Sequence, residues 1–201
     1  MALTTYSELE TAVTNWLHRA DLGSVIPDFI TLAEDRIYRM LRVRAMEEDV
    51  SGSISSGVFA LPSDYVDMKV LYLSGTTPQT VLERKAPEWM RIKYPSSNIG
   101  TPLYFSREGD SLRFGPYPDS NYALGGIYYK RLDPLADATN TIFTSHPGLW
   151  LYGSLVESAP YIGDDQRVIL WEQAFNKLLS EVNAEEVRES FSGSRLRMEA
   201  L

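Results

Sequence analysis

The sequence predicts an α+β protein in which a four-helix bundle, made of two N-terminal and two C-terminal helices, carries a mainly β domain inserted in the middle. Three observations support this fold class. Apolar residues recur at helical spacing near both ends of the chain, they alternate with polar residues in between, and both helical pairs need a partner for their apolar stripes. We therefore expect residues 1–49 and 141–190 to form the two halves of the bundle, residues 50–140 the β-rich insertion, and residues 191–201 a C-terminal docking tail.

Composition limits the classes of function. The chain has 201 residues, a formal net charge of −8 and no cysteine, which excludes disulfides, thiolate metal sites and cysteine nucleophiles. No run approaches the roughly 18 apolar residues of a membrane helix, and the first residues lack the basic and apolar segments of a secretory signal. A protein this acidic repels the DNA backbone. That disfavours a repressor or a nuclease, but it is compatible with a wall past which DNA slides.

The first helix is expected to begin at Ser7, whose side chain is spaced to form a capping box with Glu10, and to end near Arg19. A turn over residues 21–23 leads into the next helix, so the two helices should pack as an αα-hairpin. The apolar stripe of the first helix consists of Leu9, Val13, Trp16 and Leu17.

The second helix is predicted over residues 24–48, with Ser24 as its N-cap and Pro27 in its first turn. At 1.5 Å per residue it would be about 35 Å long, enough to cross a domain. We take it as the element around which the chain is organised. Its stripe consists of Ile26, Phe29, Ile30, Ala33, Ile37, Met40 and Leu41.

Basic residues gather in the second half of this helix. They are Arg36, Arg39, Arg42 and Arg44. Cations are favourable near a helix C-terminus, so a solvated face of a bundle helix explains them. A cluster of this density also suits contact with an acidic partner, and both interpretations stay open.

After Asp49 the chain becomes rich in Ser and Gly, which marks the start of the β-rich unit. Alternating runs predict strands, and Pro87 suits the first turn of one short helix. The expected strands are residues 65–73, 79–84, 102–106, 111–114 and 123–131, and the expected helix is residues 86–94. Gly125–Gly126 is expected to form a β-bulge.

The helical period returns at Pro147, where a helix should begin and run to a point before Pro160 or Gly163. Asp164 and Asp165 are expected to cap the last helix. Its apolar stripe consists of Val168, Trp171, Phe175, Leu178, Leu179 and Val182, and its acidic face of Glu181, Glu185, Glu186 and Glu189.

Catalytic and cofactor motifs are absent from the sequence. There is no Gly-Lys-Ser/Thr of a phosphate-binding loop and no G-x-S-x-G elbow. His18 suits the end of the first helix, and His146 precedes a helix start. A turn glycine followed by capping aspartates explains Gly163–Asp164–Asp165 better than a metal site does. We expect no cofactor and no metal.

The β-rich unit carries many aromatic residues that could stack on a sugar or a base. They are Tyr104, Phe105, Phe114, Tyr117, Tyr122, Tyr128 and Tyr129. A packed β core explains them better, because aromatic side chains supply much of the buried area of such cores.

Four segments of the chain resemble the head-to-tail adaptor (connector) proteins of tailed bacteriophages. They read TYSELETAVTNWLHRADL, IPDFITLAEDRIYRMLRVRAME, LPSDYVDMKVLYL and WEQAFNKLLSEVNAEE. The resemblance implies a structural virion protein, not an enzyme, that is made in the host cytoplasm and forms a ring, expected to be dodecameric. The ring would lie in the neck, between the portal protein and a tail nozzle or tail tube protein. It would line the passage for DNA without binding DNA specifically, and no membrane would be involved.

The C-terminal tail is the expected portal contact. It lacks a helical stripe and has too little apolar surface to order itself, yet it holds more apolar residues than a solubilising tail needs. The resemblance implies that this region reaches the portal, through Phe191, Arg195, Leu196, Arg197, Met198 and Leu201. The cluster Arg36, Arg39, Arg42 and Arg44 is a second candidate, for a subunit or portal contact.

Two functions of other classes remain as alternatives. One is a carbohydrate- or nucleotide-binding module that uses the aromatic residues of the β domain. The other is a hydrolase with a site around His146. Size separates them from the adaptor, because a ring is expected only of the adaptor, whereas a lone binding module stays monomeric.

Overall fold

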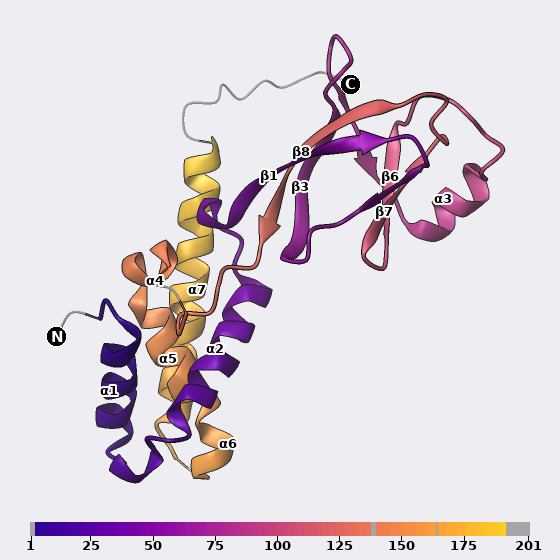
Figure 1. Cartoon of the computed structure of the whole chain (residues 1–201). Coiled ribbons are helices and arrows are strands. Elements are labelled where there is room, and N and C mark those ends of the chain that lie inside the picture. Colours follow the sequence, from indigo (N-terminus) through magenta and orange to yellow (C-terminus); the bar gives the residue numbers. More distant parts are fainter. Residues whose placement is uncertain (1–2, 138–139, 164, 192–201) are drawn as a thin grey trace. The chain divides into compact units, whose positions relative to one another are not determined.

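The computed structural model describes residues 3–137, 140–163 and 165–191, without the side chains of residues 187 and 189–191 (Figure 1). The protein is α+β, as predicted, with helices and two β-sheets. It divides into two compact units. The helical unit comprises Met1–Ala45 and Leu132–Leu201, and the β unit comprises Met46–Arg131.

The helical unit is built around α5, which contacts α1, α2 and α7. These helices span Tyr6–Leu17 (α1), Ile26–Met40 (α2), Pro147–Glu157 (α5) and Val168–Phe191 (α7). Shorter elements complete it: the 3-10 turn η1 (Ala20–Leu22) and the helices α4 (Thr141–Ser145) and α6 (Ala159–Ile162). A further 3-10 turn, η2 (Arg44–Met46), lies at the boundary with the β unit. The sequence did not predict α4, which Asn140 begins by accepting a hydrogen bond from Phe143 N at 2.7 Å.

The capping box of α1 lies two residues earlier than predicted. Thr5, in an extended conformation, is the N-cap, and its hydroxyl accepts from Glu8 N at 3.3 Å. Glu8 Oε2 in turn accepts from Thr5 N at 3.0 Å. The predicted pair of Ser7 and Glu10 is therefore wrong. His18 ends the helix as predicted, and its backbone adopts the left-handed conformation with a φ of 55°.

Helix α2 is shorter than predicted. It ends at Met40, because Leu41 turns to an extended conformation after its N–H donates to Ile37 O at 2.8 Å. Fifteen residues give a length of about 22 Å instead of about 35 Å. The last residues of the predicted helix instead begin strand β1 (Glu47–Ile54), which pairs antiparallel with β8.

The β unit consists of two four-stranded sheets, ordered β1-β8-β3-β4 and β2-β7-β6-β5. Pairing is antiparallel throughout except between β5 and β6. The strands are β2 (Val58–Ala60), β3 (Tyr65–Leu73), β4 (Thr80–Val81), β5 (Glu83–Arg84), β6 (Tyr104–Glu108), β7 (Ser111–Gly115) and β8 (Tyr122–Lys130), and the unit includes helix α3 (Pro87–Lys93). The single strand predicted over residues 79–84 is two short strands, one in each sheet.

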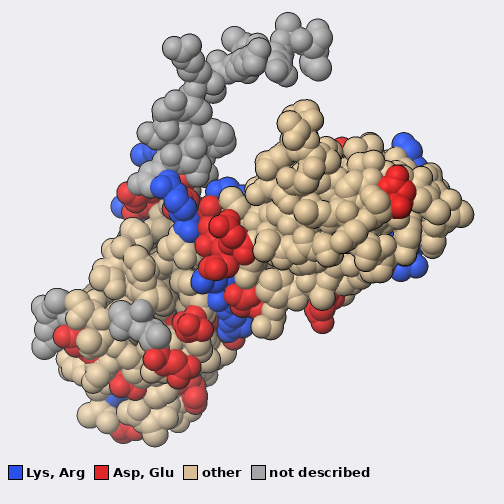
Figure 2. Space-filling model, turned by 45° about the horizontal axis from the view of Figure 1, so that its top comes forward, with Lys and Arg blue, Asp and Glu red and all other residues tan. Residues whose placement is uncertain are grey.

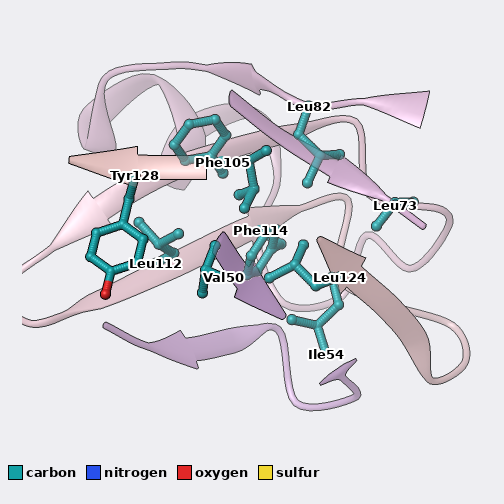
Figure 3. Packing of buried hydrophobic residues seen from close by; sticks show 10 residues of the cluster. Val50, Ile54, Leu73, Leu82, Phe105, Leu112, Phe114, Leu124 and Tyr128 are labelled. Atoms are coloured by element: carbon teal, nitrogen blue, oxygen red, sulfur yellow. The ribbon is translucent and has the colours of Figure 1, made fainter. Parts of the chain in front are cut away.

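The core of the β unit forms where side chains of both sheets meet (Figure 3). They are Val50, Ile54, Leu71, Leu73, Leu82, Phe105, Leu112, Phe114, Leu124 and Tyr128. Tyr128 donates a hydrogen bond to Asp64 Oδ1 at 3.1 Å. Burial, and then this hydrogen bond, raise the pKa of Tyr128 to about 12.

The predicted β-bulge at Gly125–Gly126 is wrong. Both glycines pair in regular register with β3, and the irregularities lie farther along, between Tyr65 and Asp67 and between Met68 and Val70. Close approach explains the glycines instead. A Cβ on Gly126 would stand 2.6 Å from Val70 O, so only glycine fits.

Candidate interaction surfaces

The arginine cluster is divided among different roles, and Arg36 holds the helical unit together. Its guanidinium lies 3.2 Å from Glu157 Oε1 of α5 and 3.3 Å from Glu172 Oε1 of α7. It also lies 4.9 Å from the centre of the Phe175 ring. Only 18% of the side chain is exposed, so Arg36 joins α2 to α5 and α7 and is not part of a solvated face.

The arginines after α2 also bind within their own chain. Arg42 donates from Nη1 to Tyr38 O at 3.1 Å, and its backbone N–H donates to Asn183 Oδ1 at 3.2 Å. Arg44 Nε lies 3.4 Å from Glu186 Oε1. These contacts attach the end of α2 to α7.

Arg39 differs from the other three arginines. It is exposed, and in the described part of the chain its side chain has neither an ion pair nor a hydrogen bond, whereas the Arg42 guanidinium donates to two backbone carbonyls. A subunit or portal contact through the cluster remains a prediction. Of its four members, Arg39 is the one whose charge is free to serve it.

Glu34 is a buried carboxylate that was not among the predicted site residues. Its Oε1 accepts from Trp150 Nε1 at 3.1 Å and from Leu135 N at 2.9 Å. It therefore fixes α5 and the chain just before α4 to α2. Its position between Ile30 and Ile37, on the apolar stripe, was the signal that could have identified it.

A large apolar hollow lies over α5 between α1 and α7. We call it the α1–α7 groove; its volume is about 630 Å³, and its lining residues are Asn15, Trp16, His18, Tyr152, Arg167, Leu170, Trp171 and Ala174. Trp16, which the sequence placed in the buried stripe of α1, is instead 43% exposed at this groove and contacts the ring of Tyr152 edge-on.

Arg167 orders one end of the groove. It donates to Trp16 O at 3.1 Å, and its guanidinium lies 5.0 Å from the centre of the Trp171 ring. It also pairs with Asp165 at 2.7 Å, and hydrogen bonds from the Arg167 side chain and N–H lower the pKa of that carboxyl. Asp165 therefore forms an ion pair with Arg167 just before the first residue of α7. Asp164, the other predicted cap, lies outside the described residues.

His146 lines a smaller hollow of about 190 Å³ together with Ser145, Glu185 and Glu186. Among the described residues, no hydrogen bond joins its side chain to any of these three groups, so a catalytic relay is not assembled there. The part of the chain that the structure describes also holds no cluster of three or more His, Asp or Glu side chains that could bind a metal ion.

The aromatic residues proposed as a binding platform separate into two groups. Phe105, Phe114 and Tyr128 belong to the core of the β unit, as a packed core requires. The other four, Tyr104, Tyr117, Tyr122 and Tyr129, are partly exposed.

An aromatic cluster around Trp89 was not predicted. Its ring centre lies 5.1 Å from that of Tyr104 and 5.7 Å from that of Tyr94. Lys85 and Lys93 place their ammonium groups 5.5 Å and 5.0 Å from the Trp89 ring centre. The chain's own lysines therefore occupy positions over this ring, where a sugar or a base would have to stack.

The portal-contact residues predicted in the tail lie outside the described residues, except for the backbone of Phe191 at the end of α7. None of the helices in the described ranges is long and apolar enough to cross a lipid bilayer.

In the described part of the chain, many polar side chains bind to the protein's own backbone and side chains, and an apolar groove lies open at the surface. These are the properties of a structural protein that works through contact surfaces. The sequence matches the SU10 adaptor protein family over residues 4–198, and the chain belongs to this family of phage adaptor proteins, which are structural components of the virion. A comparison with curated proteins found no match.

Proposed function

We propose that the protein is a head-to-tail adaptor that forms a ring, of twelve copies, between the portal and the tail. The family match carries the proposal, because it spans residues 4–198 and thus includes both units. The portal protein would bind on one side of the ring, and a tail nozzle or tail tube protein on the other. The role requires no catalytic group and no cofactor.

The architecture suits such a role. We propose that α1, α2, α5 and α7 act as one four-helix bundle, because α5 contacts the other three and Arg36 joins three of the four. The β unit is inserted between α2 and α4, so two connections tie it to the bundle. In this proposal residues 1–49 and 141–190 form the ring body, and residues 50–140 form the inserted domain.

The distribution of charge favours the helical unit as the wall of the DNA passage. It has seventeen acidic and ten basic residues, a net charge of −7, whereas the β unit has ten acidic and nine basic residues. Acidic side chains outnumber basic ones on the face of the helical unit shown in Figure 2. An acidic wall repels the phosphates, so DNA would slide without specific binding.

Attachment to the portal is proposed to use the tail, residues 191–201. Its arginines, Arg195 and Arg197, would pair with carboxylates of the portal, while its apolar residues fill small grooves. A variant without residues 191–201 should keep its melting temperature, measured by circular dichroism, yet lose most of its binding to portal-bearing heads. Full occupancy of the truncated protein on such heads would move the attachment site to another surface, with Arg39 as the first candidate.

Electron microscopy of the protein mixed with the portal of its own phage tests the central proposal. We expect added density in the form of a closed ring on one end of the portal, with an open axial channel. A portal that gains no density at saturating concentration, with the protein remaining monomeric in solution, would overturn the adaptor role.

A further inference from the structure

The β unit has one long, unpaired sheet edge. The edge strands of its two sheets are β1, β4, β2 and β5. Strand β1 has eight residues, whereas β2 has three and β4 and β5 have two each. Proteins commonly keep edge strands short, because a free edge pairs readily with a strand of another chain. Among the described strands, β1 is therefore the edge on which a further strand can pair.

Hydrogen bonds elsewhere in the sheet show which backbone groups of β1 face outward. Ala123 O of β8 accepts from Ser74 N at 2.9 Å, so Ala123 faces β3 and not β1. Ala123 lies opposite Ser53, and the register between β1 and β8 has no shift. Antiparallel partners alternate between residues that bond each other and residues that face away, so Asp49, Ser51 and Ser53 direct their N–H and C=O groups away from β8. In the described part of the chain these backbone groups have no hydrogen-bond partner.

The side chains along this edge leave room for another strand. Ser51 and Ser53 are small and exposed, and Gly52 between them has no side chain. On the core side, where Val50 points (Figure 3), Phe59 of β2 covers Gly52 so closely that a Cβ there would stand 2.5 Å from Phe59 Cε2. Phe59 is itself only half-buried. Alternate residues of an added strand can therefore pack on this ring, while the others face water.

A second copy of the chain does not suit this edge. Pairing of β1 with another β1 is two-fold symmetric and closes at two copies, whereas a ring needs a contact between two different surfaces. The other edge strands could supply a different surface, but they are only two or three residues long. Two copies would also repel each other, because each has a formal net charge of −8. These properties favour a strand of a different protein.

The charges on β1 indicate the chemistry of that strand. Glu47 pairs with Lys69, and Glu48 pairs with Lys130 at 2.8 Å. Asp49 is exposed and has no ion pair among the described residues. A Lys or Arg beside Asp49 would complement its charge. Because Asp49 and the Phe59 ring lie on opposite faces of the sheet, the matching segment alternates basic and apolar residues.

We propose that β1 receives an extended segment of the tail nozzle or tail tube protein as a further strand of the β1-β8-β3-β4 sheet. Main-chain hydrogen bonds to Asp49, Ser51 and Ser53 hold the segment, and its alternating side chains provide the specificity. The portal side of the ring is assigned to residues 191–201, so the β1 edge serves the other side. The inference rests on the proposed ring and identifies the surface that recruits the tail.

A proline substitution tests the pairing. Ser51→Pro removes an N–H that bonds no described group of the chain, and proline is tolerated at such a position of an edge strand. We expect the ring to form on portal-bearing heads as before. Binding of the purified tail nozzle or tail tube protein of the same phage should fall roughly tenfold, because a backbone donor is lost and the proline ring obstructs the added strand.

The matched control is Ser51→Thr, which keeps the N–H and should bind like the unaltered protein. Circular dichroism checks that both variants keep their melting temperature. Equal binding of the tail-side protein by Ser51→Pro and Ser51→Thr overturns the proposed pairing.

Hydrogen exchange of the unaltered protein gives a second measurement, which does not depend on a variant. When the tail-side protein binds the ring, a peptide covering residues 47–54 should gain about three slowly exchanging amides, those of Asp49, Ser51 and Ser53. A peptide covering residues 65–73 is the control, because β3 already has a neighbour on both sides. Electron microscopy scores the ring separately. A portal without a ring rejects the adaptor role and this inference with it, whereas a ring whose residues 47–54 gain no protection rejects this inference alone.

Discussion

The helical unit and the β unit are stabilised by different kinds of interaction. The β unit is nearly neutral, and its core lies between two sheets that cover each other. Its ion pairs join residues that are exposed or half-buried, such as Arg84 with Asp67 and Lys130 with Glu48. Exposed pairs of this kind contribute little to stability, so this unit depends on apolar packing.

The helical unit also has an apolar core, but it adds polar groups that are buried between its helices. Glu34 and Arg36, two residues apart on α2, bind partners on α5 and α7. The same unit carries most of the net charge and leaves an apolar groove open. The comparison shows that apolar packing between sheets dominates one unit, whereas the other combines an apolar core with buried polar contacts and an open apolar groove.

The largest expected effect concerns the apolar core of the helical unit. Phe175 is fully buried, contacts Arg36 and lies beside Gly153. Truncating a buried aromatic residue costs roughly 3–5 kcal/mol, so Phe175→Ala should lower the free energy of unfolding by that amount. Urea denaturation measures it. The control is Glu185→Ala, on the exposed side of the same helix, which should change little. Equal stabilities for the two variants would show that the wrong face of α7 has been assigned to the core.

The next effect tests the buried polar group. Glu34→Ala leaves Trp150 Nε1 and Leu135 N without the acceptor that they share. Each buried donor without a partner costs about 1–3 kcal/mol, so we expect a loss of roughly 2–4 kcal/mol. Glu34→Gln keeps one acceptor oxygen and should recover part of this loss. Asp28→Ala, an exposed acid on α2, is the matched control. Thermal unfolding measures the effect. If Glu34→Ala lowers the melting temperature no more than Asp28→Ala does, buried polar groups do not distinguish the helical unit from the β unit.

A smaller effect is expected in the β unit, where packing between strands determines stability. Gly126→Ala forces a Cβ to within 2.6 Å of Val70 O, a backbone atom that cannot move without disturbing β3. Overpacking of this kind costs about 1–3 kcal/mol. Gly75→Ala, whose nearest neighbour atom is Ala123 Cβ at 3.8 Å, should be close to neutral. Chemical denaturation followed by circular dichroism compares the two variants. No difference between them would contradict the close approach.

Much of the fold followed from periodicity. The buried residues of α7, Trp171, Phe175, Leu179 and Val182, lie on the predicted stripe, and strand β3 has the predicted ends. Such segments are long enough for a repeat of 3.6 or 2 to be distinguished from chance. The prediction of where α2 ends was wrong, because arginines are good helix formers and masked the change from helical to alternating hydrophobic periodicity. Leu41 and Val43 are buried while Arg42 and Arg44 are not, an alternation typical of extended chain.

The candidate surfaces were harder to predict than the fold. The sequence identified the arginine cluster, but it could not assign Arg36 to Glu157 and Glu172, which lie more than 100 positions away along the chain. The α1–α7 groove was missed for the same reason, because Trp16 looked like a member of a buried stripe until α5 and α7 were placed beside α1. Local patterns determine which face of a helix is apolar, but tertiary packing determines how much of that face stays open.

The smallest expected effect is an absence of binding, and it tests whether the charge difference between the units governs contact with DNA. Duplex DNA carries about one charge per 1.7 Å, and its non-specific affinity for proteins comes from Lys and Arg that neutralise phosphates. The helical unit has a net charge of −7, and the nearly neutral β unit offers no compensating excess of base.

The protein should therefore not retard duplex DNA in a gel-shift experiment near physiological salt. In the matched variant, Glu181 and Glu185, which are both exposed on α7, are replaced by lysine. The two replacements raise the net charge by about four units, so this variant should retard DNA. Added salt should abolish the retardation, because salt screens exposed charges. The two results together would place the barrier to DNA binding on the helical unit. Retardation of the unaltered protein with a dissociation constant in the micromolar range would defeat the sliding-wall proposal, because such affinity requires basic contacts that would slow the passage of DNA.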